Sequence, residues 1–364
     1  MVRRDVIFAA LAATLVVLYV WGWSALAPIV GLPAAASSPT PRPTRPAEQT
    51  GVARLSGTIA FVLRGDVYVL RDGRYAPLTS EGRNEQPSLS ADGTMLYFAR
   101  KEEIDGKRVV DGQLTNAQLG YTSIIRKPTI GGAEETVVNG LRQRSPSGQH
   151  QVSWFLGPAL SPDGARLALM EDDGDGGADL VVVPLPIARP GTSTPRPGTA
   201  TPQPRPTILS QGADLADATW SPDGKQIATT TYNTDQPGIL LWDAAKIGAA
   251  QRLGGLPDGD AYRPAFSPDG KWIVYTLRHK GLNDVHAYEL ATKRDVALTT
   301  DGRSWNGVLS PDGKWLAFLR ERGGTIDLYA MELDDALSGG KPKDAVKLTR
   351  GEGIDGGSRP SWSR

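Results

Sequence analysis

Three histidines, His150, His279 and His286, are the side chains of this 364-residue chain best suited to proton transfer or metal binding. No two of them have the spacing that places metal ligands together on a helix. His286 stands where Tyr68 and Tyr329 stand in a repeated strand pattern, which favours a structural role. The sequence has no Gly-x-Ser-x-Gly nucleophile elbow and no glycine-rich phosphate loop. We therefore predict no catalytic residue, no cofactor and no enzymatic activity.

An acidic run, Asp172–Asp179, is the one segment whose composition suits a metal ion. Asp173, Asp175 and Asp179 offer oxygens that Ca²⁺ accepts, but the twelve-residue loop with its terminal glutamate is missing. A solvated hairpin tip is the simpler interpretation, and calcium binding stays open. The chain has no cysteine, which excludes thiolate metal sites, thiol nucleophiles and disulfides. We predict no metal site.

The composition is that of an ordinary globular protein rather than of a nucleic-acid binder. The chain has 40 basic and 40 acidic residues and no visible basic patch, so no nucleic-acid partner is expected. Its 42 glycines and 28 prolines mark many turns, as in an all-β protein with short strands.

The apolar segment at residues 6–30 carries no charge and is long enough to span a bilayer. Arg3 and Arg4 precede it, so residues 1–5 should stay in the cytoplasm and the rest should lie outside the cytoplasmic membrane. The alternative is a signal peptide cleaved near Ala34–Ala36, which would release a secreted protein. Residues 31–54 are a Pro/Thr-rich linker that cannot form a packed core.

The domain at residues 55–364 contains an internal repeat built on Ser-Pro-Asp-Gly. An apolar residue precedes each serine, and a β-prone run such as Trp272–Tyr275 follows the glycine. Proline sets the first corner of the turn, and glycine accepts the positive φ that follows. The chain therefore turns tightly between two strands at each repeat. The repeated serines are Ser90, Ser161, Ser221, Ser267, Ser310 and Ser363.

Each repeat continues with a third strand and a fourth, which makes four strands, the content of one propeller blade. The C-terminal segment supplies only a first strand, whereas the domain begins at Thr58 with a second strand. The two ends should therefore complete one shared blade and remove two exposed sheet edges. The sequence predicts an all-β, six-bladed propeller closed by its N- and C-terminal strands. The segment 184–206, rich in Pro and Thr, should be a disordered insertion.

These repeats resemble the WD40-like PD40 repeat of TolB-like β-propellers. The resemblance rests on the Ser-Pro-Asp-Gly-Lys turn, on Asp-[Ile/Leu]-Tyr strands and on terminal Leu-Thr pairs, and it covers essentially residues 55–364. It implies the fold more than a function, because propellers carry unrelated activities. The chain departs from TolB itself by its apolar N-terminal run and by lacking an N-terminal α/β domain.

Residues just before the first strands should rim the central channel on the face opposite the Ser-Pro-Asp-Gly turns. Three long insertions, Arg100–Gln118, Asn139–Gln151 and Glu171–Ala178, should lie as loops on that same face. The candidate ligand- or partner-binding residues are Asn84, Glu85, Gln86, Trp154, Asp217, Tyr262, Arg263, Trp305, Asn306 and Arg359.

These features predict a non-enzymatic, membrane-anchored module of the cell envelope that binds a protein, a ligand or an envelope polymer. One alternative is a channel-site lyase or hydrolase built from the rim residues, and turnover in a broad screen would identify it. A second alternative is an extracytoplasmic sensor that signals through a membrane partner.

Overall fold

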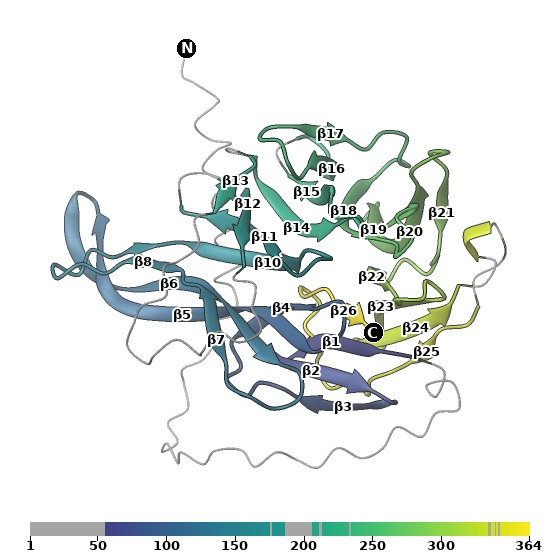
Figure 1. The fold of residues 1–364 in the computed structure, drawn as a ribbon, viewed down its shortest axis with the longest axis horizontal. Helices are drawn as coiled ribbons and strands as arrows, with labels where there is room; N and C mark the ends of the chain where they lie inside the picture. Colours follow the sequence, from purple (N-terminus) through teal and green to yellow (C-terminus); the bar gives the residue numbers. More distant parts are fainter. Residues whose placement is uncertain are drawn as a thin grey trace. The chain divides into compact units, whose positions relative to one another are not determined.

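The computed structural model describes residues 55–364 except 175–176, 186–205, 211–212, 233, 334–335, 339 and 341–342. The regular secondary structure of the described chain is β-strand except for one 3₁₀ turn, η2 (Ala336–Ser338) (Figure 1). No helix within these residues is long and apolar enough to cross a membrane. The predicted transmembrane segment at 6–30, the linker 31–54 and most of the insertion 184–206 lie outside the described residues.

Four sheets have four strands each; in three of them the strand order follows the chain, and in the fourth the last strand of the chain lies beside the first. The closing sheet contains β26 (Ser361–Ser363), β1 (Thr58–Leu63), β2 (Asp66–Arg71) and β3 (Arg74–Pro77). The next contains β14 (Leu215–Trp220), β15 (Gln226–Thr231), β16 (Gly238–Asp243) and β17 (Ala250–Arg252). Another contains β18 (Asp260–Phe266), β19 (Trp272–His279), β20 (Leu282–Glu289) and β21 (Asp295–Ala297). The last contains β22 (Ser304–Leu309), β23 (Trp315–Arg322), β24 (Thr325–Glu332) and β25 (Val346–Lys347).

The remaining strands form one eight-stranded sheet and a small two-stranded one. The large sheet joins two antiparallel meanders through a single parallel bridge between Trp154 and Thr122. The prediction of six separate blades is therefore wrong as stated, because hydrogen bonding gives four four-stranded sheets and one of eight strands. The first meander is β4 (Asn84–Leu89), β5 (Met95–Val110), β6 (Gln113–Pro128) and β7 (Glu135–Val138). The second is β10 (Trp154–Leu160), β11 (Arg166–Asp172), β12 (Asp179–Pro184) and β13 (Thr207–Ile208); β8 (Leu141–Gln143) pairs with β9 (Gln151–Val152).

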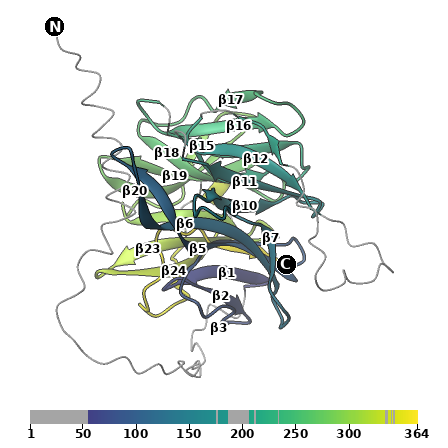
Figure 2. The same cartoon turned by 90° about the vertical axis from the view of Figure 1, so that its left-hand side faces the viewer.

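The two ends of the domain pair as predicted. Strand β26 lies antiparallel to β1, with Ala60 opposite Ser361 and Thr58 opposite Ser363. The first strands contact one another in the cyclic order β4, β10, β14, β18, β22 and β26, and β26 contacts β4. Six first strands therefore form a closed ring. Later strands lie outward in their sheets: in Figure 2, β15, β16 and β17 follow one another toward one edge of the domain, and β1, β2 and β3 toward the opposite edge.

The Ser-Pro-Asp-Gly turns have one geometry throughout. In the last of them, the Ser310 hydroxyl donates to Asp312 Oδ1 at 2.6 Å and accepts from the Trp315 amide at 2.9 Å. Asp312 also accepts from the Lys314 amide at 3.1 Å, and Gly313 has φ +70°. The serine and aspartate side chains thus satisfy the backbone groups that a tight turn leaves unpaired, because such groups are costly when buried.

Apolar side chains from adjacent sheets pack between the blades. Tyr275, Phe98 and Phe318 are fully buried, as is the middle of nearly every second strand. The second strands read as near-continuous apolar runs because both of their faces are covered. This packing holds the ring of first strands in place.

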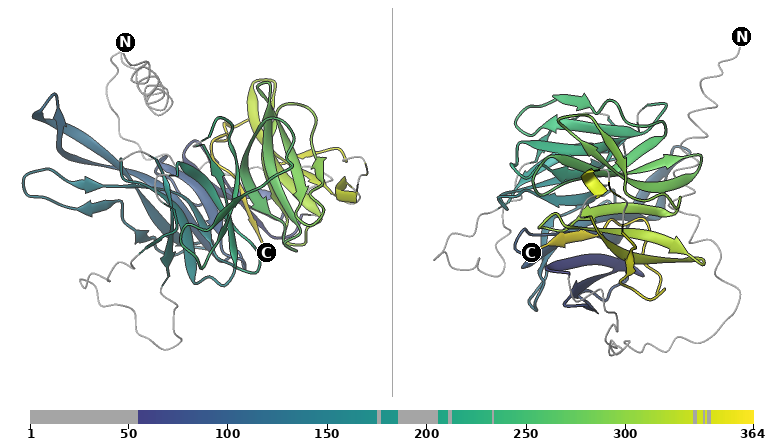
Figure 3. Two further views of the ribbon diagram at one scale, coloured as in Figure 1. Left: turned by 90° about the horizontal axis from the view of Figure 1, so that it is seen from above. Right: turned by 90° about the vertical axis from the view of Figure 1, so that its right-hand side faces the viewer.

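The β5–β6 hairpin is the main departure from a compact propeller. Each strand has 16 residues, and they pair in unbroken register from Met95–Pro128 to Val110–Gln113. Beyond Arg100 the hairpin has left its own sheet, since β4 pairs with β5 only as far as Asn84–Arg100. We call Lys101–Tyr121 the arm; in Figures 1 and 3 it projects from the domain, with the β8–β9 hairpin alongside.

Candidate functional site

Each first strand carries a distinctive residue four positions before the repeated serine. In five strands this residue has positive φ, between 52° and 59°, beside an irregularity in the pairing with the second strand. Such a β-bulge re-aims a side chain, and here it occurs in five of the six first strands. We call this set the bulge ring: Gln86, Gly157, Asp217, Arg263, Asn306 and, in the closing strand, Arg359.

Arg263 connects several members of the bulge ring. Its guanidinium donates from Nη1 to Asn306 Oδ1 at 2.5 Å and to the Gly356 carbonyl at 3.1 Å, and from Nη2 to the Gly357 carbonyl at 3.0 Å. Its Nε lies 3.9 Å from Asp217 Oδ1. Asp217 also accepts a hydrogen bond from the Thr230 hydroxyl at 3.1 Å. Three neighbouring blades are therefore linked by side chains at the ring.

Arg359 and Gln86 close the other side of the ring. Arg359 donates to the carbonyls of Pro264 and Ala218, the latter at 3.1 Å. Burial lowers the pKa of its guanidinium, and the Asp217 carboxylate acts in the opposite direction. Gln86 Oε1 accepts from the Gly157 amide at 2.6 Å. Arg359 and Gln86 thus hydrogen-bond to backbone groups of other first strands, which leaves them poorly placed for acid–base chemistry.

Aromatic side chains surround the ring. The Tyr262 hydroxyl donates to Asn283 Oδ1 at 2.5 Å, and Trp305 Nε1 donates to the Gly356 carbonyl at 2.9 Å. Tyr232 joins them although it was not among the predicted site residues, and it is 43% exposed. Burial and then the nearby Asp217 charge raise the pKa of Tyr232. A usable signal was its position directly after a second strand, where the chain returns to this face.

Three predicted site residues lie away from the ring. Asn84 is buried, donates to Thr79 Oγ1 at 3.0 Å and accepts from Arg100 Nε at 2.8 Å. Glu85 pairs with Lys101 Nζ at 2.8 Å. Trp154 lies in register with Asp172 at the start of β10. Asn84 and Glu85 therefore support the base of the arm, and the predicted single rim divides into a ring and this base.

The three predicted loops differ from what the sequence suggested. Arg100–Gln118 is regular hairpin rather than loop, and Asn139–Gln151 contains the β8–β9 pair. Glu171–Ala178 begins as the end of β11 and includes two undescribed residues. Residues 100–118 form a regular hairpin rather than a loop because strand pairing does not require a buried face. Polar side chains on both strands are compatible with a ribbon that is exposed to solvent.

The remaining chemistry-bearing residues have structural partners. His286 Nδ1 lies 2.8 Å from Asp295 Oδ2, and Tyr275 donates to the same carboxylate at 2.7 Å. His150 Nδ1 accepts from the Ser145 amide at 3.0 Å. Within the described ranges no three His, Asp or Glu side chains are grouped to hold a metal ion. Asp175 of the acidic run lies outside those ranges.

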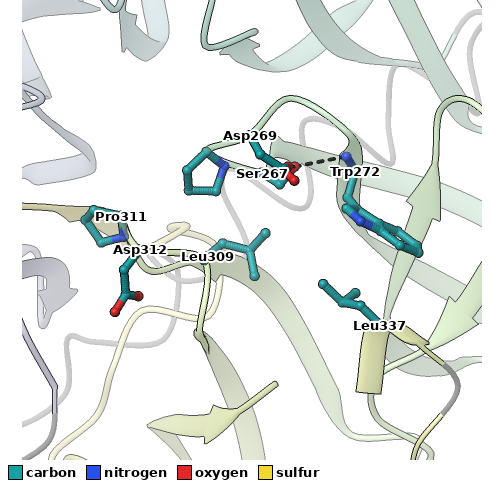
Figure 4. A pocket seen from close by; sticks show the side chains of 9 residues that line it. Ser267, Asp269, Trp272, Leu309, Pro311, Asp312 and Leu337 are labelled. Carbon is teal, nitrogen blue, oxygen red and sulfur yellow. Dashed lines mark hydrogen bonds between the residues drawn. The ribbon is translucent and has the colours of Figure 1, made fainter. Parts of the chain in front are cut away.

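A cavity of about 340 Å³ lies on the face that carries the Ser-Pro-Asp-Gly turns, between the turn that begins at Ser267 and the turn that begins at Ser310 (Figure 4). Trp272, Leu309 and Leu337 supply apolar walls, and Asp269 and Asp312 lie at its edges. Both carboxylates already accept hydrogen bonds from their own turns. The cavity therefore follows from the spacing of two turns.

Comparisons with known proteins give one consistent result. Residues 205–363 match the family model described as TolB beta propeller domain. A 94-residue segment is 30% identical to the Tol-Pal system protein TolB of Ruthia magnifica subsp. Calyptogena magnifica, and covers 26% of this chain and 22% of that protein. An 81-residue segment is 32% identical to the TolB of Alcanivorax borkumensis, and covers 21% and 17%. The matched segments thus span less than a quarter of these relatives.

Solved structures extend the similarity to most of the domain. TolB from Acinetobacter baumannii superposes with a TM-score of 0.60 at 18% identity, over 84% of this chain and 66% of that one. A putative TolB from Agrobacterium tumefaciens gives 0.57 at 17% identity, over 83% and 91%. The curated relatives are named as proteins of the Tol-Pal system. The described chain therefore has a β-propeller fold similar to that of TolB.

Proposed function

We propose that this protein is a non-enzymatic binding or scaffolding module of the cell envelope, held outside the cytoplasmic membrane by residues 6–30. The named relatives belong to the Tol-Pal system, and the uncharged run at 6–30 is long enough to act as a tether. The bulge ring supports a binding role over a catalytic one, because its charged groups are engaged with one another.

We also propose that the eight-stranded sheet counts as two blades, so that the ring has six. Each of its two meanders has a first strand, and each first strand belongs to the closed ring. The single bridge between Trp154 and Thr122 that joins them has a counterpart elsewhere. Asn283 and Arg303 form the same kind of parallel bridge between two sheets that are otherwise separate. The bridge is thus a recurring contact between neighbouring blades.

The partner is proposed to dock on the face that carries both the arm and the aromatic residues around the bulge ring. We call these residues, Tyr232, Tyr262 and Trp305, the mouth of the ring. The observation that carries this proposal is the arm itself, whose tip exposes Val109 by 63% and Leu114 by 54%. A two-stranded ribbon with little core beneath it gains little stability from projecting into solvent, so a binding role explains its length. At the mouth, Tyr232, Tyr262 and Trp305 supply aromatic surface of the kind enriched at interfaces.

The test is capture of partners from crosslinked cells by the affinity-tagged full chain. The arm is trimmed by replacing residues 103–120 with Asn-Gly, so that Glu102 and Tyr121, which pair in register, close a two-residue hairpin. The control deletes residues 190–202 from the insertion between β12 and β13. A partner retained by the control and lost on trimming supports the proposal.

A second set of variants separates the arm from the mouth. Tyr232→Ala removes an exposed aromatic group without touching a blade core. A loss of capture of tenfold or more in this variant would place part of the interface at the mouth. If the same partner survives both trimming and Tyr232→Ala, the proposed docking face is wrong.

A further inference from the structure

The arm leaves one strand edge without hydrogen-bond partners. In the β5–β6 register Val110 faces Gln113 across a two-residue turn, so alternate residues of β6 point their backbone groups away from β5. Thr122 shows this orientation, because its amide donates outward to the Ser153 carbonyl at 3.4 Å. Toward the tip, the outward residues are Leu114, Asn116, Gln118 and Gly120. Among the described residues no backbone group pairs with them on that side.

The two edges of the arm are protected to different degrees. On β5, the outward amides of Lys101 and Lys107 donate to the carbonyls of Arg83 at 2.9 Å and Gly148 at 2.8 Å. The β5 half of the arm also carries six charged residues: Lys101, Glu102, Glu103, Asp105, Lys107 and Arg108. On β6, residues 113–121 contain neither a charge nor a proline. Natural sheets use charges and prolines to prevent edge pairing, and the β6 edge has neither.

We propose that the β6 edge of the arm pairs with the same edge of a second copy of this chain. The strands run antiparallel about a two-fold axis at Ala117. Leu114 then faces Gly120 of the second copy, and Asn116 faces Gln118 of the second copy. Every outward residue of both edges lies in a hydrogen-bonded pair, and each such pair exchanges two backbone bonds. The result is a four-stranded sheet in the order β5, β6, β6, β5.

The chemistry of the edge favours a second copy because a two-fold pairing requires self-complementarity. The small side chain of Ala117 meets only itself on the axis. Leu114, 54% exposed, faces Gly120, where a side-chain atom would have open space around it. The edge carries no charge, so two identical strands meet without like-charge repulsion. The pairing goes beyond the proposed function, since it leaves the mouth of the ring free for a partner.

Cysteine crosslinking tests the register, because the natural chain has no cysteine. In the full chain Ala117→Cys places two thiols in a directly opposed, non-hydrogen-bonded pair with Cα atoms about 4.5 Å apart, within disulfide range. Thr115→Cys is the matched control, because Thr115 faces Leu119 and its own copy lies about 13 Å along the strand. We expect Ala117→Cys to give at least five times more disulfide dimer on mild oxidation. Equal yields, or no dimer in either variant, would overturn the proposal.

Proline substitution tests the hydrogen bonding. Gln118→Pro removes an outward amide that the hairpin does not use, whereas Gln118→Thr keeps it. We expect detergent-solubilised wild type and Gln118→Thr to be dimers by light scattering, and Gln118→Pro to be a monomer with an unchanged melting temperature. If Gln118→Pro unfolds, Asn116→Pro is measured in its place. A proline variant that stays folded and dimeric contradicts the proposal.

The same variants separate this inference from the proposed function. A monomeric Gln118→Pro chain should still capture the envelope partner, because only the β6 edge is blocked. A wild type that is monomeric, together with a Gln118→Pro variant that loses capture, would show that the edge takes the partner rather than a second copy.

Discussion

Arg263 Nη1 donates a hydrogen bond to Asn306 Oδ1 at 2.5 Å, and the two residues occupy the same bulge position in neighbouring blades. The backbone of both has positive φ, 57° and 59°. Because no ladder of strand hydrogen bonds joins these two sheets at the axis, side chains make the connection. The bulge thus turns a strand residue into a link between blades.

Removing the Arg263 side chain should destabilise the domain without changing its fold. Arg263→Ala abolishes the contacts with Asn306, Gly356 and Gly357 and leaves the Oδ1 of the buried Asn306 without its charged donor, at a cost of about 1–3 kcal/mol. Alanine and arginine experience similar strain at positive φ, so the side chain dominates the difference. Urea denaturation measures the free energy of unfolding. Arg263→Lys is the control, and it should recover only part of the loss because it lacks the planar fork.

Two repeated serines should respond differently to removal of their hydroxyl. Ser310→Ala removes contacts to Asp312 and the Trp315 amide, at a cost of about 1–2 kcal/mol. Among the described residues the buried hydroxyl of Ser363 has no hydrogen-bond partner. Ser363→Ala should therefore be neutral or stabilising by up to about 1 kcal/mol. Thermal denaturation of both variants checks the contrast, and equal losses would contradict it.

The turn aspartates should contribute a pH-dependent stability. The hydrogen bond from the Ser161 hydroxyl, with one from the Ala165 amide, lowers the pKa of Asp163. The unfolded chain has the ordinary aspartate pKa of about 3.9. Because the folded pKa is the lower one, the contribution is complete above the unfolded value and is lost as pH falls through the folded value. The free energy of unfolding of wild type should therefore fall more steeply below about pH 4 than that of Asp163→Asn.

Trimming the arm should leave the propeller stable. The Asn-Gly replacement of residues 103–120 removes mostly exposed residues and none of the fully buried core. We expect the melting temperature to change by only a few degrees, because shortening an exposed ribbon removes little apolar burial. Differential scanning calorimetry measures it. A large drop would show that the arm and the β8–β9 hairpin stabilise the blades.

Much of the fold follows from local chemistry. The turn serines, prolines and aspartates dictate where strands end, and the apolar runs after them dictate which strands are covered on both faces. The pairing of Thr58 with Ser363 was also predictable, because the end repeats are incomplete in complementary ways. The positions of the bulge ring are marked only weakly in the sequence, by a proline that follows Gln86, Gly157, Arg263 and Arg359. The hydrogen bonds of the bulge ring could not be predicted from the sequence, because they join residues up to 141 positions apart.

The sequence by itself determined the repeat, the turn chemistry, the closing strand pair and the lack of thiol chemistry, since each depends on residues close in the chain or on composition. Tertiary structure alone decided that Arg100–Gln118 is a paired ribbon, that two meanders share one sheet through Trp154 and Thr122, and that Asp217, Arg263, Asn306 and Arg359 meet. The physical reason is that closing a ring places distant residues in contact, and side-chain partners across the axis are set by geometry rather than by spacing along the chain.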